Sequence, residues 1–210
     1  MGSASARPLL IFPFNGNGLE ALDCLGDTWT FAGFVDDTPE KQGRTAHGHP
    51  VYARDAFARM PEASVLAVPG SPTSYPYRRK LIEELGVAPE RFARVVHPRA
   101  SVSPLATLGR NALLLAGVVV TSDAVIGDHV CILANTVIHH DVVVGDWSLV
   151  GSNVTLAGGS AIGANCYVGS GTNVKNGVRI ADGALVGLGS VVVRDVPAGA
   201  RVAGNPARPI

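Results

Sequence analysis

The sequence predicts a small α/β domain followed by a solenoid of short parallel strands. Strand-like and helix-like segments alternate over residues 1–97, and an aliphatic residue then recurs every six positions within residues 98–210. The composition changes at the same place: the last glutamate is Glu90, and only 8 of the 91 residues from Val102 to Val192 are charged. We therefore expect two domains, 1–97 and 98–210.

Alternating strands and helices organise the first domain. Strands are expected at 9–12, 29–35, 64–68 and 92–96, and helices at 19–25, 53–60 and 73–85. In the last helix Tyr77, Leu81 and Leu85 share one face, which makes the helix amphipathic, whereas 78–80 (Arg-Arg-Lys) is interpreted as a solvated face. The alternation predicts a parallel sheet built from βαβ units.

A period of six residues organises the second domain. Sixteen positions in steps of six, from Val102 to Val192, are all Ile, Leu or Val, and the positions two residues earlier are all small or β-branched. This period fits a triangular coil with three short strands per turn, in which the aliphatic residue points inward and the small residue lies at the corner. Because the faces of such a prism are flat and almost uncharged, we expect copies to stack into a homotrimer.

The composition also excludes several classes of protein. The 17 basic and 17 acidic side chains balance, which argues against binding of nucleic acid through phosphate contacts. No apolar run reaches 18 residues, so no membrane span is expected, and no secretory signal is recognised. The three cysteines fit a reducing compartment, and we expect a cytoplasmic protein.

Several motifs together resemble one family. They are the [Ile/Leu/Val]-Gly-x4 array and the segments 33–37 (Gly-Phe-Val-Asp-Asp), 96–100 (Val-His-Pro-Arg-Ala), 140–141 (His-Asp) with 145–146 (Gly-Asp), 156–159 (Leu-Ala-Gly-Gly) and 202–207 (Val-Ala-Gly-Asn-Pro-Ala). Over almost its whole length the chain resembles the left-handed β-helix hexapeptide acyltransferases. The branch it resembles holds the sialic acid O-acetyltransferases and the bacillosamine-type sugar N-acetyltransferases, in which a small Rossmann-like domain precedes the left-handed parallel β-helix.

The resemblance implies transfer of an acetyl group from acetyl-CoA to an amine, or less often a hydroxyl, of a sugar. Several members act on nucleotide-linked 4-amino sugars, with the nucleotide on the N-terminal domain and the active site between neighbouring β-helices. It implies acetyl-CoA as co-substrate, no metal, and a place in polysaccharide or glycan synthesis.

His140 is the candidate general base. It lies two positions after the inward Ile138, so its side chain is expected to leave the prism, and an imidazole can take the proton of an attacking amine. By resemblance, Asp141 holds the other ring nitrogen, and the backbone N–H of Gly158 stabilises the oxyanion. The alternative is a surface His-Asp pair and a turn glycine without a catalytic role; His139 is interpreted as a partly exposed turn residue.

Later coils are expected to line the CoA arm. The candidate acetyl-CoA contacts are Leu149, Gly158, Ser170, Gly171, Gly187 and Leu188. Leu149 is a departure, because many family members carry a second histidine nine residues after the base. A leucine cannot bond a thioester or a water, so acetyl-CoA is held differently here, or the acyl group differs.

The nucleotide is assigned to the first loop and to the end of the second strand. Two glycines before a helix can bring backbone N–H groups to a phosphate, although Pro13 removes one donor and the family's loop is denser in glycine. The two acidic residues are candidates for base or ribose contacts, with a solvated turn as the alternative. The candidate nucleotide-sugar contacts are Asn15, Gly16, Asn17, Gly18, Asp36 and Asp37.

Three other functions remain as alternatives to N-acetylation of a nucleotide-linked amino sugar. The first is O-acetylation of a sugar such as sialic acid, and the second is a non-catalytic trimer that binds a sugar nucleotide. The third, a γ-type carbonic anhydrase, needs three metal histidines, and His129, His139 and His140 do not repeat at a coil spacing.

Overall fold

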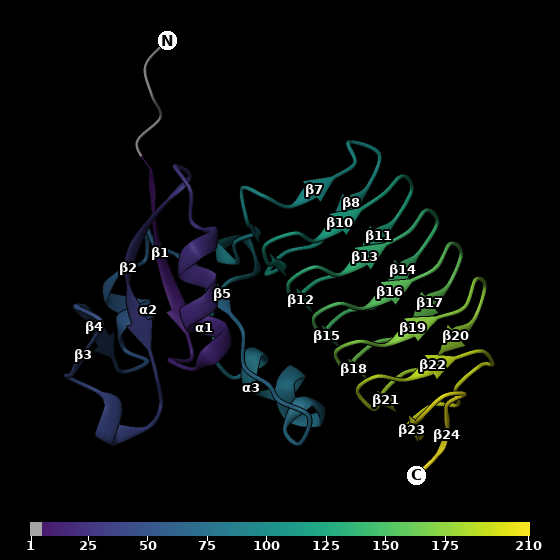
Figure 1. The fold of residues 1–210 in the computed structure, drawn as a ribbon. Helices are drawn as coiled ribbons and strands as arrows, with labels where there is room; N and C mark the ends of the chain where they lie inside the picture. The colour runs from purple at the N-terminus through teal and green to yellow at the C-terminus, as the bar shows by residue number, and fades with distance from the viewer. Residues whose placement is uncertain (1–5) are drawn as a thin grey trace.

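The computed structural model describes residues 6–210, in which a five-stranded sheet lies beside a long solenoid (Figure 1). The sheet has the order β3-β4-β2-β1-β5, and β1 is paired in parallel with β2 on one side and β5 on the other. Its strands are β1 (Arg7–Phe12), β2 (Trp29–Val35), β3 (Thr45–Ala46), β4 (His49–Tyr52) and β5 (Ser64–Ala67). The expected strands at 9–12, 29–35 and 64–68 are confirmed, and the β3–β4 hairpin was not expected.

Short helices cover the sheet. The α-helices are α1 (Gly16–Glu20), α2 (Ala56–Arg59) and α3 (Arg78–Glu83), and the 3-10 helices are η1 (Ala21–Cys24), η2 (Pro39–Lys41), η3 (Tyr75–Tyr77) and η4 (Pro89–Arg91).

The expected 73–85 helix is shorter than predicted, and Tyr77 departs from the face that it was expected to share with Leu81 and Leu85, which both pack in the core. A 3-10 turn precedes α3, so Tyr77 is 70% exposed, while Arg78 and Ile82 are buried. The solvated reading of 78–80 therefore fails at Arg78, and only Arg79 and Lys80 lie in solvent, each four residues before a glutamate that it pairs with.

The segment 92–96, expected as the last strand of the α/β sheet, connects that sheet to the solenoid instead. Phe92 forms a single parallel bridge to Val65 at the edge of the sheet, and β6 (Val95–Val96) pairs with a strand of the solenoid. The solenoid pairing thus begins at β6, directly after this bridge.

The solenoid is a left-handed parallel β-helix with three faces. Face 1 contains β6, β9 (Leu113–Leu114), β12 (Cys131–Ile132), β15 (Leu149–Val150), β18 (Tyr167–Val168), β21 (Leu185–Val186), β23 (Arg201–Ala203) and β24 (Arg208–Pro209). Face 2 contains β7 (Ser101–Val102), β10 (Val119–Val120), β13 (Val137–Ile138), β16 (Thr155–Leu156), β19 (Asn173–Val174) and β22 (Val191–Val192). Face 3 contains β8 (Thr107–Leu108), β11 (Val125–Ile126), β14 (Val143–Val144), β17 (Ala161–Ile162) and β20 (Arg179–Ile180).

The six-residue pattern is confirmed by the packing inside the coils. From β6 to β22 the paired strands lie 18 residues apart, the spacing falls to 16 between β21 and β23, and the stepped aliphatic positions from Leu114 to Val192 are all buried in one core. At the corners, every sixth residue adopts a left-handed backbone. Beside glycines, the residues at these positions are Asn111, Asp123, His129, Asn135, Asp141, Trp147, Asn153 and Asn165.

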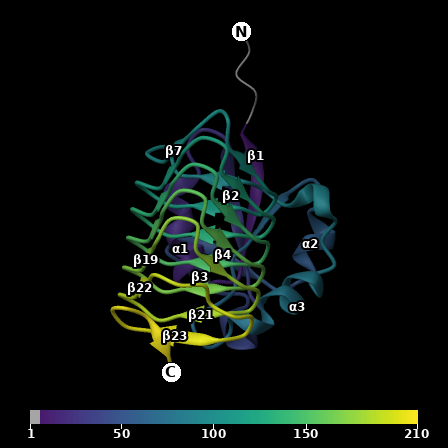
Figure 2. The same ribbon diagram turned by 90° about the vertical axis from the view of Figure 1, so that its right-hand side faces the viewer.

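Face 1 is the face that meets the α/β domain. Outward residues of face 1 (Leu113, Cys131 and Leu149) are buried in the same cluster as Leu9 and Leu66 of the parallel sheet. Figure 2 shows the stacked coils with α2 and α3 on one side. Among residues 6–210, no helix is both long and apolar enough to cross a membrane.

Candidate active site

His140 and Asp141 lie at the corner between faces 2 and 3, which we call the His140 corner. Nδ1 of His140 is 2.7 Å from Oδ2 of Asp141, and both side chains are mostly exposed. Because a carboxylate only accepts, the neutral ring carries its proton on Nδ1 and leaves the Nε2 lone pair free. Asp141 has φ of 58°, so the carboxylate occupies a corner position where asparagine or glycine is usual in this solenoid.

Gly158 lies one coil further on, against the imidazole. A Cβ at this position would lie 2.6 Å from both Cε1 and Nε2 of His140, so the ring occupies the space that a side chain would fill. The N–H of Gly158 donates no hydrogen bond to residues 6–210, whereas its carbonyl accepts one from the N–H of Gly177. The free base nitrogen and a free backbone donor therefore lie side by side.

Replacing Gly158 by alanine is expected to lower kcat about 100-fold with little change in the unfolding temperature. The new methyl group displaces an exposed ring rather than the backbone, so the fold is spared, while a displacement of about 1 Å can cost ~10² in rate. Steady-state kinetics and thermal unfolding measure the two effects. Gly159→Ala is no substitute as a control because Gly159 has φ of 68°; Ala157→Gly, in the same turn, is the matched control.

The other acetyl-CoA candidates lie at a different corner of the same chain. Ser170, Gly171, Gly187 and Leu188 follow strands of face 1 and precede strands of face 2, and Leu188 is 81% exposed. They are thus separated from the His140 corner by the width of face 2.

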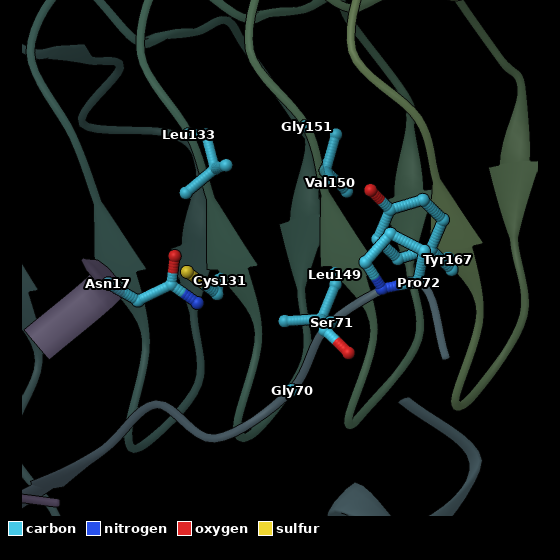
Figure 3. A pocket seen from close by; sticks show the side chains of 10 residues that line it. All are labelled: Asn17, Gly70, Ser71, Pro72, Cys131, Leu133, Leu149, Val150, Gly151 and Tyr167. Atoms are coloured by element: carbon cyan, nitrogen blue, oxygen red, sulfur yellow. The ribbon is translucent and has the colours of Figure 1, made fainter. Parts of the chain in front are cut away.

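Leu149 lies on face 1, where it is 6% exposed and contributes to a cavity of about 210 Å³ between the domains. The α/β domain contributes the loop after β5 and one residue of α1, and face 1 contributes outward residues of β12, β15 and β18 (Figure 3). The cavity is lined by Asn17, Gly70, Ser71, Pro72, Cys131, Leu133, Leu149, Val150, Gly151 and Tyr167.

The cavity lies where ligands commonly bind in open parallel sheets. Asn17 follows β1 and Ser71 follows β5, so both lie beyond the carboxyl ends of neighbouring parallel strands. Asn17 and Leu149 were candidates on the sequence alone, whereas Ser71 and Tyr167 were not. The loop after the third expected strand was the available signal for Ser71.

The first loop is held by hydrogen bonds of its own residues. The side chain of Asn15 accepts from the N–H of Gly18 and caps α1, and a Cβ at Gly18 would lie 2.6 Å from the carbonyl oxygen of Pro13. The N–H groups of Gly16 and Asn17, in the first turn, donate to no group among residues 6–210.

The buried carboxylate of Asp36 holds this loop by hydrogen bonds. It is 2% exposed, and its carboxylate accepts from the N–H groups of Phe14 and Thr38 and from Nζ of Lys41. Burial by itself raises the pKa of this carboxyl, but the hydrogen bonds from Thr38 and Lys41 outweigh burial and hold the pKa below its usual value. Asp37 lies nearer to solvent and pairs with Arg54.

The remaining histidines and acidic groups do not gather. His129 lies at the corner between faces 3 and 1, stacked on Trp147 with ring centroids 3.9 Å apart. Burial, together with the charge of Arg78, lowers the pKa of His129 to about 4, so the ring is neutral near pH 7. Within 6–210 no group of three or more His, Cys, Asp or Glu side chains is placed to hold a metal ion.

Comparison with known proteins gives matches over part and over all of the chain. The family "Bacterial transferase hexapeptide (six repeats)" matches residues 105–138 and 123–158. No match was found among curated proteins.

Several solved structures match at full length, among them the following three. The acetyltransferase domain of PglB from Neisseria gonorrhoeae FA1090, in complex with acetyl coenzyme A, is 27% identical with a TM-score of 0.86, and the match covers 98% of this chain and 100% of that chain. PerB from Caulobacter crescentus, in complex with CoA and GDP-perosamine, is 30% identical with a TM-score of 0.83 and covers 100% of both chains. WeeI from Acinetobacter baumannii AYE is 26% identical with a TM-score of 0.83, covering 98% of this chain and 100% of that chain.

Proposed function

Because the chain belongs to the hexapeptide-repeat acyltransferases, in the branch with a Rossmann-like N-terminal domain, we propose that it transfers an acetyl group from acetyl-CoA to the amino group of a nucleotide-linked amino sugar. The observation that carries the proposal is the His140 corner, where a histidine held by a carboxylate lies against a glycine with a free N–H. The full-length match to PerB with CoA and GDP-perosamine supports the substrate class.

The chemistry follows from the hydrogen bond between Nδ1 of His140 and Asp141, which leaves the lone pair of Nε2 free. The sugar amine attacks the thioester carbon, a C–N bond forms, and the amine proton passes to Nε2 of His140. Asp141 stabilises the resulting imidazolium through Nδ1, and the N–H of Gly158 donates to the oxyanion. The C–S bond then breaks, and His140 returns the proton to the leaving CoA sulfur.

The placement of the candidate CoA residues supports a homotrimer. His140 and Leu188 lie at different corners of one chain, so a single CoA can contact both corners more readily when they come from neighbouring copies. Face 3 also presents Val125 and Val143, which are 42% and 44% exposed, close to the His140 corner. Apolar residues on a flat face are suited to burial against another copy.

The nucleotide-linked part of the acceptor is assigned to the α/β domain. The free N–H groups of Gly16 and Asn17 lie at the edge of the sheet, and the cavity next to Asn17 is large enough to admit part of a ligand. Asn15, Gly18 and Asp36 shape this loop by bonds within the chain, and Asp37 remains a candidate for a contact with the nucleoside.

The proposal is tested by release of free CoA thiol from acetyl-CoA across a panel of UDP-, GDP- and dTDP-linked 4-amino sugars. We expect turnover with one nucleotide class, accompanied by a mass gain of one acetyl group on the sugar nucleotide. Thiol release with free sialic acid and none with the panel would instead identify an O-acetyltransferase. Binding of a sugar nucleotide without thiol release from any acceptor would contradict an enzymatic role.

A further inference from the structure

Arg78, the first residue of α3, is a buried cation that the proposed chemistry does not use. It is 1% exposed, and its Nε, Nη1 and Nη2 atoms are buried and donate to no group among residues 6–210. Burial lowers the pKa of Arg78 to about 10, which leaves the guanidinium charged near pH 7. Buried charges are normally paired, because an uncompensated charge is strongly destabilising.

The side chain of Arg78 lies behind Gly70, a residue of the cavity wall, and does not itself line the cavity between the domains. A Cβ at Gly70 would lie 3.3 Å from Cδ and 3.6 Å from Nε of Arg78, and 2.7 Å from Cδ1 of Leu149. Gly70 and Leu149 both line the cavity, so Cδ and Nε of Arg78 lie next to its wall. The cavity itself contains no charged side chain; its polar side chains are those of Asn17, Ser71 and Tyr167, with the thiol of Cys131.

Three other cations near this edge of the sheet are already engaged in ion pairs. Lys41 pairs with Asp36, and Arg54 pairs with Asp37. Arg79 pairs with Glu83 on the exposed side of α3. Since the chain has no net charge, an anionic ligand in this region depends on a local cation, and Arg78 is a buried cation whose donors are free among residues 6–210.

We propose that Arg78 binds the diphosphate of the nucleotide-linked sugar, which enters the cavity when the 70–72 segment moves aside. A guanidinium can bond two phosphate oxygens in parallel, which suits this ligand. Gly70 has φ of 128°, a conformation open only to glycine. Because glycine has a wide choice of backbone conformations, the segment can change direction at Gly70. The inference rests on the proposed function, whose substrate it places.

The test compares Arg78→Met with the wild-type enzyme, using Arg79→Met on the exposed face of α3 as the matched control. The probes are inorganic pyrophosphate, UDP, GDP and dTDP, with the corresponding nucleosides lacking phosphate. Isothermal titration calorimetry gives Kd, and thermal unfolding without ligand gives Tm.

We expect Arg78→Met to weaken diphosphate binding at least ten-fold, while the weak binding of nucleosides is unchanged. The Tm of the ligand-free variant is expected to stay equal or to rise, because a methionine replaces an uncompensated charge with an apolar chain. Arg79→Met is expected to change neither quantity. A lower Tm with unchanged diphosphate affinity would show that Arg78 serves the fold, and failure of the wild type to bind any diphosphate would also overturn the inference.

If Arg78→Met does not fold, Arg78→Lys is used instead, because lysine keeps the charge and loses the paired donors. Unchanged diphosphate affinity in Arg78→Lys overturns the inference, and a loss of affinity of about five-fold or more supports it. Thiol release separates this inference from the proposed function. Turnover of a nucleotide-linked sugar with an unchanged KM in Arg78→Met removes the inference and leaves the function. Diphosphate binding that depends on Arg78, without turnover by the wild type, supports the inference and contradicts the proposed function.

Discussion

Replacing His140 by alanine is expected to lower kcat by about 10²–10⁴-fold, the range that a positioned general base contributes. The imidazole is held by Asp141 with Nε2 free beside Gly158, and alanine removes this positioned proton acceptor. The side chain is 61% exposed, so the unfolding temperature and the assembly state are expected to stay unchanged. Steady-state thiol release and size-exclusion chromatography with light scattering measure the two expectations.

His139→Ala is the matched control for this variant. His139 precedes His140 in the same turn, and its backbone N–H is bonded to the carbonyl of Leu156, which the substitution retains. Its removal is expected to change kcat less than about three-fold, well below the effect of losing a general base. Equal turnover in His140→Ala and the wild type would remove His140 as the base.

Replacing Asn111 by alanine is expected to destabilise the protein by roughly 2–6 kcal/mol, because it removes two hydrogen bonds to buried backbone groups of Ala67 and a third, to Nδ1 of His129. Its side chain accepts from the N–H of Ala67 at 2.7 Å and donates to the carbonyl of the same residue at 2.8 Å. Ala67 is fully buried at the edge of the α/β sheet, so one asparagine of the solenoid pairs this edge as a neighbouring strand would. Without it, both backbone groups of Ala67 remain buried and unbonded.

The left-handed backbone of Asn111 adds a second cost that a control can subtract. Its φ is 52°, where alanine is disfavoured by roughly 1–2 kcal/mol. Asn135 has φ of 58° at an exposed corner, so Asn135→Ala measures that conformational cost without loss of the bonds to Ala67. Denaturant unfolding compares the two variants, and hydrogen exchange follows the Ala67 amide. Equal destabilisation in the two variants would mean that the bonds to Ala67 contribute nothing.

The solenoid could be predicted from the sequence because its physical cause is local and repeated. One inward aliphatic residue in six defines the core, and the positions from Leu114 to Val192 are buried as the pattern predicts. Beside the aliphatic and the small positions, the sequence holds a third position that repeats every six residues. Asn, Asp or Gly recurs there, at the left-handed corners, and Asp141 is one of these residues. His129 and Trp147 break this register, and both lie where the corner meets the α/β domain.

The contacts between the domains could not be predicted in the same way. The phase of α3 depends on a preceding 3-10 turn that begins with Tyr75-Pro76, and this turn brings Arg78 inward where helical spacing alone favoured Tyr77. Pairing of β6 with the solenoid likewise depends on contacts with residues 18 positions later. The cavity combines loops and strands far apart in the chain, so only Asn17 and Leu149 were anticipated there.

Strands from β6 to β22 pair with strands 18 residues away. The separation of two residues along the sequence therefore sets their distance along the solenoid axis. Neighbouring strands lie about 4.8 Å apart, so His140 and Leu188, 48 residues apart, are offset by about 13 Å along the solenoid axis. The number of coils between the two corners therefore sets the axial distance between them. Gain or loss of one 18-residue module between the two corners would change the reach available to a co-substrate by one coil, with the corner chemistry left intact.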